Sequence, residues 1–174
     1  MTIKGRVVLV LTVVLLGIAL DQGTKDLARR TLVESERHSY LMDTFRLQLV
    51  PNDGAFLGLG SKLDKSTRFW VFTVLVGVTM VVLAAYVFLS TGPTRGQRIA
   101  FALILSCGTS NLADRIYNDG SVVDFLNLGI GPVRTGIFNV ADMAILGGCL
   151  FLVFFGGKPK QAEQPSEEPA PAEE

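Results

Sequence analysis

Residues 69–89 read "FWVFTVLVGVTMVVLAAYVFL", a run of 21 residues without a charge, and this run decides the fold class. A helix of about 20 apolar residues crosses the hydrocarbon core of a bilayer. The rest of the chain suits the same environment, because 49% of its residues are hydrophobic and its mean hydropathy is +0.42. Such values are ordinary for a small membrane protein. We therefore predict an all-α membrane protein.

Three further segments have the apolar character of membrane helices. Residues 135–157 contain one charged residue, Asp142. Residues 7–20 and 99–113 are uncharged but short, so each helix must continue through polar residues in order to span a bilayer. The sequence thus predicts four transmembrane helices, at about residues 6–27, 67–90, 97–115 and 136–156.

The first helix has a rival interpretation as a cleaved signal peptide, because Lys4 and Arg6 precede a signal-like apolar core. No A-x-A-like cleavage site follows that core, and the helical pattern continues past Asp21. We therefore expect a helix that is retained in the mature protein.

Two long loops, residues 28–66 and 116–135, connect the predicted helices on one side. In the first loop, residues 45–49 alternate apolar and polar side chains as a strand does, and residues 51–54 form a turn signal. The same loop contains glycines that allow close backbone approach, namely Gly54, Gly58 and Gly60. We expect a small β-cradle on the extracytoplasmic membrane surface and a second extracytoplasmic loop.

Basic residues in the other connections predict the orientation of the chain in the membrane. They lie before the first helix, in the short 91–98 loop and after the last helix: Lys4, Arg6, Arg95, Arg98, Lys158 and Lys160. Both termini are therefore expected in the cytoplasm. The 28–66 loop also carries six basic residues, but it is long and mixes them with acids. Residues 158–174 hold five of the sixteen acids and four of the seven prolines, so we expect a disordered cytoplasmic tail.

Composition argues against several classes of function. The formal net charge is zero and the chain has no long basic run, so nucleic acid is not an expected partner. Cys107 and Cys149 both fall in apolar segments without metal-ligand spacing, and His38 is the only histidine. We expect no metal, no cofactor and no disulfide framework.

The polar residues of the predicted helices gather at one membrane face. If four helices alternate in direction, the end of the first, the end of the third and the start of the fourth lie at the same level. Polar residues occupy all three places: Asp21, Lys25, Asn111, Asp114, Arg115, Asn139 and Asp142. Within the third and fourth helices their spacing is three or four residues, so they share a helix face.

Simpler interpretations of these residues stay open. Asp21 and Lys25 have the spacing of an ordinary i,i+4 ion pair, and Asp114 and Arg115 have the position of interface anchors. A structural role for Asp142 is harder to maintain, because it lies about two turns into the predicted span. A charged carboxylate there costs roughly 2.5–3.5 kcal/mol on insertion scales.

A second aspartate suggests what Asp142 does. Asp124 lies in the β-prone run "SVVDFL", and only a short loop separates this run from the fourth helix. Two carboxyl groups that meet share a proton and titrate as a pair. Such a pair deprotonates a water and protonates a leaving amide nitrogen, as an aspartyl peptidase requires. Two aspartates by themselves are a weak signal, and their spacing does not prove that they meet.

Four blocks of the sequence together resemble the prolipoprotein signal peptidases, also called signal peptidase II. "DQGTK" (21–25) resembles D-Q-x-[ST]-K, and "NDGAFLG" (52–58) resembles N-x-G-A-x-F. "SNLADRIYNDGSVVDFL" (110–126) resembles G-N-L-I-D-R followed by G-x-V-x-D-F, and "FNVADMAILGG" (138–148) resembles F-N-x-A-D. Their order and helix placement agree from about residue 5 to 157, which leaves only the tail outside.

The resemblance implies an aspartyl endopeptidase of the bacterial inner membrane. Its substrates are prolipoproteins that carry a diacylglyceryl group on the lipobox cysteine, and it cuts just before that cysteine. Asp124 and Asp142 are implied as the catalytic pair. Substrate-binding or supporting roles are implied for Asp21, Lys25, Asn52, Gly54, Asn111, Asp114, Arg115 and Asn139. Globomycin-type inhibitors and membrane lipids are expected ligands, and we expect a monomer.

Two departures from the family pattern concern the supporting residues. Ser110 stands where glycine is usual, which bears on close helix packing, and Phe56 comes one residue earlier than the usual aromatic, with Leu57 in its place. Two rival functions stay open on the residues alone. One is a small membrane transporter or proton relay that uses intramembrane acids, and the other is a non-enzymatic assembly factor.

Overall fold

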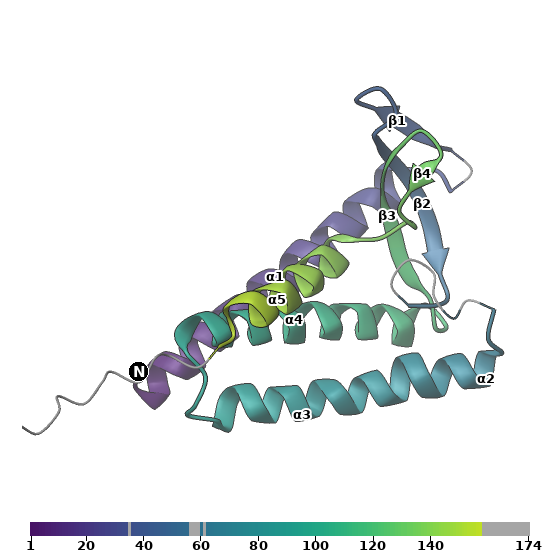
Figure 1. Ribbon diagram of the computed structural model, residues 1–174. Coiled ribbons are helices and arrows are strands. Elements are labelled where there is room, and N and C mark those ends of the chain that lie inside the picture. The colour runs from purple at the N-terminus through teal and green to yellow at the C-terminus, as the bar shows by residue number, and fades with distance from the viewer. Residues whose placement is uncertain (35, 56–59, 61, 158–174) are drawn as a thin grey trace, which may run out of the picture.

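The computed structural model describes residues 1–34, 36–55, 60 and 62–157. Within these residues, long helices lie side by side and a four-stranded antiparallel sheet lies at the end away from the N-terminus (Figure 1). Phe56, Leu57 and Gly58 of the predicted cradle lie outside the described residues, and so does the predicted disorder of the 158–174 tail.

The helices begin at residues that satisfy their free N–H groups. Thr2 caps α1 (Ile3–Thr31) and Asp64 caps α2 (Lys65–Arg68), which continues through the π-helical segment η2 (Phe69–Leu75) into α3 (Val76–Leu89). Thr94 and Gln97 form a capping box at the start of α4 (Arg95–Tyr117). Asn139 caps α5 (Val140–Phe155). α1, α2, α4 and α5 thus each start at a short polar side chain that replaces water as the acceptor, whereas α3 continues directly from η2.

Helix α4 is the centre of the helical part, because α1, α3 and α5 all pack against it. Small residues allow this close packing, as is common between membrane helices. A Cβ atom on Gly17 of α1 would lie 2.3 Å from the Ser106 hydroxyl of α4. A Cβ atom on Gly148 of α5 would lie 3.1 Å from the Ala100 carbonyl oxygen. Larger side chains at either position would separate these helices.

Apolar side chains of the outer helices point away from the protein. The largest exposed ones include Leu15 and Leu16 of α1, Val81 and Val82 of α3, and Val153 and Phe154 of α5. A surface this apolar is suited to lipid contact. In the part of the chain that the structure describes, two helical stretches are long and apolar enough to cross a membrane, Ile3–Thr31 and Lys65–Leu89, and α5 is a shorter apolar helix.

The sheet combines the two long loops. β1 (His38–Tyr40) pairs with β2 (Phe45–Asn52), β2 with β3 (Val122–Ile130), and β3 with β4 (Val133–Arg134), all antiparallel. The alternation of residues 45–49 predicts part of β2. β3 lies in the second predicted loop, where it includes most of the β-prone run 121–126 and extends it to Ile130. The register places Val50 of β2 opposite Asp124 of β3, so this pairing carries Asp124 toward the helices.

Two sets of contacts around the middle of β3 join the sheet to the helices. Ala28 of α1, Leu49 of β2 and Phe125 of β3 form a buried apolar cluster. Phe138 pairs with Leu126 of β3, and its N–H donates to the Leu126 carbonyl at 2.9 Å. This pairing holds the chain extended until Asn139.

The last helix consequently begins at Val140 rather than at the predicted residue 136. Asp142 therefore lies in the first turn of α5, and its predicted position two turns into the helix is wrong. The physical reason is that residues before Asn139 satisfy their backbone groups by pairing with β3 instead of by helix formation.

Candidate active site

Lys25 and Asp21, at the sheet end of α1, form a fully buried ion pair. Both side chains are 0% exposed, and Lys25 Nζ lies 2.6 Å from Asp21 Oδ2. Lys25 Nζ also lies 3.0 Å from Asp114 Oδ2 and donates to Asn111 Oδ1 at 2.7 Å. The pair is therefore not an ordinary exposed i,i+4 contact, because it joins α1 to two side chains of α4.

Asp21 fixes the relative positions of three helices. Its Oδ2 accepts from the Ser110 hydroxyl of α4 at 2.7 Å, and its Oδ1 accepts from the Ala141 N–H of α5 at 2.9 Å. Gln22 donates to the same Ser110 hydroxyl and to Asp114 Oδ1, both at 2.9 Å. Ser110 thus takes part in the polar network where the family usually has glycine.

The sequence prediction did not include Gln22. Its position inside the "DQGTK" block is a signal that was available in the sequence. The side chain faces α4, as do those of Asp21 and Lys25, because all three lie on the side of α1 that α4 covers.

Asn111 connects the buried ion pair to Asp142. Its Oδ1 accepts from Lys25 and, at 3.2 Å, from Asn139 Nδ2. Its Nδ2 donates to Asp142 Oδ1 at 3.1 Å. Both halves of the amide are engaged, so the Asn111 side chain has a single orientation that presents an N–H group to Asp142.

Asn139 contacts both aspartates. Its backbone N–H donates to Asp142 Oδ2 at 3.3 Å, and its side-chain Nδ2 donates to Asp124 Oδ1 at 2.7 Å. Its Oδ1 in turn accepts from the Asp142 N–H at 3.0 Å, which completes a capping box. One residue thus places a carboxyl group of the sheet beside a carboxyl group of α5.

Asp124 is held from the other side by the turn that follows β2. Asn52 Nδ2 donates to Asp124 Oδ2 at 2.7 Å and to the Ala55 carbonyl at 3.0 Å, and Asn52 Oδ1 accepts from the Gly54 N–H at 2.9 Å. Asp124 is 1% exposed. Burial raises the pKa of Asp124 to about 7, the hydrogen bond from Asn52 opposes this rise, and the nearby Asp142 adds to it.

Arg115 reaches across the site from α4. It donates to the Gly54 carbonyl at 2.9 Å and to the Asn111 carbonyl at 3.3 Å, and it lies 5.9 Å from the centre of the Phe72 ring. Its Nε is buried and has no partner among the described residues. Arg115 therefore connects the turn after β2 to the helices, and its Nε–H group makes no hydrogen bond to the described residues.

A groove of about 320 Å³ leads from this polar network down between α3, α4 and α5. Asn111, Arg115 and Asp142 line its polar end. The remainder is lined by apolar and small side chains, namely Val76, Met80, Ile104, Gly108, Ile145, Leu146 and Cys149. The groove is thus suited to an extended or helical apolar segment whose end reaches Asp142.

Comparison with known proteins assigns this fold and site to a family. Residues 13–156 match the family model described as Signal peptidase (SPase) II. The chain belongs to the signal peptidase II family. It is 40% identical over 143 residues to the lipoprotein signal peptidase of Moorella thermoacetica, a match that covers 82% of this chain and 88% of the relative. The corresponding protein of Nitratidesulfovibrio vulgaris is 35% identical over 158 residues, covering 88% and 90% of the two chains.

Solved structures share the fold. Two structures described as bacterial membrane enzymes match with TM-scores of 0.73 and 0.67, at 20% and 21% sequence identity. The first match covers 89% of this chain and 92% of the other, and the second covers 83% and 89%. The family model and the relatives confirm the resemblance inferred from the four sequence blocks, and membership of the family identifies the protein as a peptidase.

In this member of the signal peptidase II family, the structure brings all ten predicted site residues together. Asp124, Asp142 and Asn139 form the centre of the hydrogen-bond network, and Asn52 with Gly54 extends it to the sheet. The network continues along α4 through Asn111 and Arg115. It reaches α1 through the contacts of Lys25 with Asp21 and Asp114. Within the described ranges, no group of three or more His, Cys, Asp or Glu side chains has an arrangement that could hold a metal ion.

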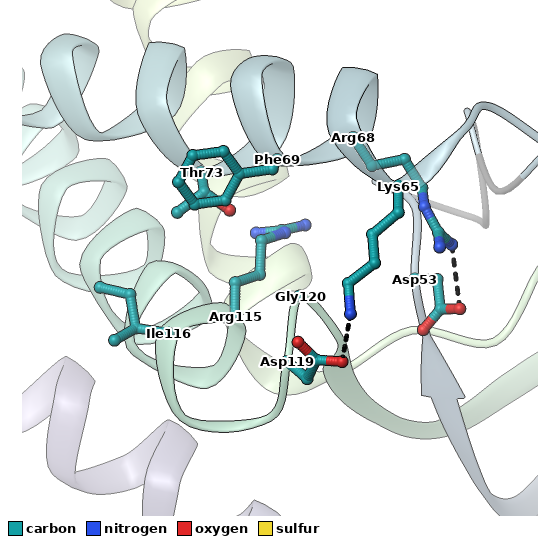
Figure 2. A pocket seen from close by; sticks show the side chains of 9 residues that line it. All are labelled: Asp53, Lys65, Arg68, Phe69, Thr73, Arg115, Ile116, Asp119 and Gly120. Carbon is teal, nitrogen blue, oxygen red and sulfur yellow. Dashed lines mark hydrogen bonds and ion pairs between the residues drawn. The ribbon is translucent and has the colours of Figure 1, made fainter.

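A second cavity, of about 240 Å³, lies behind Arg115 between α4 and the start of the α2–η2 helix. Figure 2 shows two ion pairs at its mouth, Lys65 with Asp119 and Arg68 with Asp53. The Ser121 hydroxyl and Arg68 both lower the pKa of Asp53. These contacts hold the start of α2 against the turns beside β2 and β3, and they are exposed enough that each contributes about 0–1 kcal/mol to stability.

Proposed function

We propose that this chain is an aspartyl endopeptidase that removes the signal peptide from diacylglyceryl-modified prolipoproteins by cutting before the lipidated cysteine. The observation that carries the proposal is the contact of Asn139 with both aspartates. The lipoprotein signal peptidases among the relatives support the substrate class. Asp142 lines the apolar groove, and Asp124 lies buried beside it.

In the proposed reaction, the two carboxyl groups share one proton. The ionised carboxylate takes a proton from water, and the water oxygen bonds to the carbonyl carbon of the scissile amide. The protonated carboxyl gives its proton to the carbonyl oxygen. The first carboxyl then protonates the leaving nitrogen as the C–N bond breaks, and the second takes a proton back from the diol oxygen. The pair thus returns to its starting state with one proton.

The surrounding residues give this pair its geometry. Asn111 and Asn139 donate hydrogen bonds that keep the Asp142 carboxyl directed into the groove. The buried Lys25 anchors Asn111 from behind. Arg115, whose Nε has no partner among the described residues, is placed to hold a substrate carbonyl at the polar end of the groove.

We place the four helical stretches α1, α2–η2–α3, α4 and α5 across the inner membrane of a bacterium. The aspartates and the sheet lie at one end of the helices, and Lys4, Arg6, Arg95 and Arg98 belong to the other end. Basic residues favour the cytoplasmic side. Asp124 and Asp142 then lie at the extracytoplasmic interface, where the end of a signal helix and a lipid-bearing cysteine meet.

Lipidation of the substrate cysteine should decide whether the substrate is cut. Each buried methylene contributes about 0.8 kcal/mol to anchoring, so two acyl chains fix the depth of the scissile bond firmly. We expect the purified protein to cut a diacylglyceryl-modified prolipoprotein and to cut the same chain with an unmodified cysteine far more slowly. The measurement is a gel-shift time course on both substrates in the same micelles.

The matched control is a lipidated substrate whose mature part begins with a different residue after the cysteine, which should still be cut. Equal rates for the lipidated and unmodified chains would overturn the argument that the acyl chains fix the depth of the scissile bond. The aspartyl mechanism is tested separately, by the variants of Asp124 and Asp142. Failure to cut either chain under conditions where a relative cuts the lipidated one would overturn the proposed function.

The pH dependence of cleavage should report the shared proton. Because the pKa of Asp124 is raised to about 7, its proton is present below that pH and is lost as the pH rises through it. The catalytic form is therefore lost on the alkaline side, and kcat/KM should fall about tenfold per pH unit well above that pKa. Initial rates in detergent test this, with thermal unfolding at each pH as the control for folding. A rate that keeps rising at high pH would contradict it.

A further inference from the structure

A second polar site lies at the end of the helices opposite the two aspartates. There, a cavity of about 340 Å³ is lined by three arginines, Arg6 of α1 and Arg95 and Arg98 of α4, and by Thr94 at the start of α4. No acidic side chain belongs to the described lining of this cavity. The cluster is separate from the peptidase site, which contains none of these residues.

The arginines at this cavity are incompletely paired. Arg98 is 1% exposed and donates to the carbonyl groups of Val87 and Ser90 at the end of α3. Arg6 donates to the same Ser90 carbonyl at 2.9 Å. The Nε atoms of Arg6 and Arg98 are buried and have no partner among the described residues.

The negative end of the α3 helix dipole compensates only part of the positive charge of these arginines. A helix C-terminus carries about half a negative charge, so it stabilises one cation. Here it faces Arg6 and Arg98 together, and Arg95 adds a third positive charge. A buried charge without a full counter-charge is costly. The cluster therefore lacks an anion.

The sequence supplies no such anion from the helices. Residues 1–20, 65–113 and 143–157 contain no aspartate or glutamate, and these ranges include every helical segment near the cavity. Beyond them, acidic residues at this end of the chain occur only in the tail after residue 157. An external anion is the other way to complete the site.

We propose that this cavity binds the phosphate group of an anionic phospholipid. Guanidinium groups match phosphate oxygens in geometry, and the N-terminus of α4 adds a favourable dipole beside Thr94. Basic pockets between membrane helices bind anionic lipid head groups in this way. A lipid is favoured over free phosphate because Ile3 and Leu89, near the lining residues along the chain, are 71% and 78% exposed and extend an apolar surface for acyl chains.

The test is a binding titration of the full chain in neutral detergent, followed by native mass spectrometry. The probes are phosphatidylglycerol, phosphatidylcholine and inorganic phosphate. We expect saturable binding of phosphatidylglycerol and about tenfold weaker binding of phosphatidylcholine, because the choline ammonium of phosphatidylcholine offsets the phosphate charge that the arginines attract. Inorganic phosphate that displaces phosphatidylglycerol fully at millimolar concentration would overturn the lipid assignment.

The variants are Arg95→Gln and the double substitution Arg6→Gln, Arg95→Gln. Arg95 is exposed, and Arg98 is kept because it satisfies the end of α3. The double variant should bind phosphatidylglycerol at least about tenfold more weakly, while both variants keep peptidase activity in detergent. Lys4→Gln is the matched control, because it removes a charge at the same end but does not line the cavity.

Three further results would overturn the proposal. The first is unchanged binding of phosphatidylglycerol by the double variant, and the second is an equal loss in Lys4→Gln. The third concerns the tail: a chain without residues 161–174 should bind phosphatidylglycerol as the full chain does. A tenfold or greater gain on its removal would identify the acidic tail as the occupant instead.

Discussion

Asp124→Asn and Asp142→Asn should each reduce cleavage of a lipidated prolipoprotein by about 10³-fold or more, because each removes a proton-transfer group that the other cannot replace. The pair works as a unit, since Asn139 holds both carboxyls. The measurement is single-turnover cleavage by purified variants in the same micelles. The double variant should be no worse than either single one, as is expected when two groups act in one step.

Asp26→Asn is the matched control for these two variants. Asp26 is an exposed aspartate of α1 that pairs with Arg30, outside the hydrogen-bond network of the site. It should cut at the rate of the unmodified protein. Thermal unfolding separates loss of chemistry from loss of folding, and near-normal turnover of either Asp124→Asn or Asp142→Asn in folded protein would refute the aspartyl mechanism.

Lys25→Met should destabilise the protein by about 3–5 kcal/mol, the usual cost of removing one partner from a buried ion pair. The substitution leaves Asp21 and Asp114 without their counter-charge, and Asn111 Oδ1 keeps only the hydrogen bond from Asn139. Because these side chains join α1 to α4, we expect the loss to appear as a large fall in the temperature of unfolding in detergent.

Helix α1 offers a control of the same geometry. Arg30 and Asp26 are also an i,i+4 pair, 2.8 Å apart, but their side chains are 75% and 54% exposed. Arg30→Met should therefore cost less than about 1 kcal/mol. Adding Asp114→Asn to Lys25→Met should restore part of the stability by removing one uncompensated charge. Equal losses for Lys25→Met and Arg30→Met would show that burial does not govern this pair.

Sequence patterns of short range predicted much of the helical part. An uncharged run such as 69–89 has few alternatives to a membrane-crossing helix, because its backbone must satisfy itself by hydrogen bonds along the chain. The order of the four blocks was sufficient to recognise the family, which the comparison confirmed. The ten site residues came from these blocks together with the alternation of helix direction.

The tertiary structure decided which of these groups touch. Hydropathy describes one segment at a time, whereas the contacts of Asp124 depend on how β3 pairs with β2 and meets Asn139 at the start of α5. Three findings needed that packing: the pairing of β3 with β2, the start of α5 at Val140, and the role of Gln22. The same is true of the arginine cavity at the other end, where residues more than eighty positions apart share one carbonyl.

By itself, then, the sequence determined that the chain has long apolar helices, that the ten predicted site residues belong to one end of them, and to which family it belongs. Only the tertiary structure decided that Asn139 bridges the two aspartates and that Lys25 is buried among its partners. The physical reason is that these properties depend on interactions over different distances along the chain. Helix formation and burial in lipid are local properties of a segment, but a hydrogen bond between a strand and a helix exists only after both have packed.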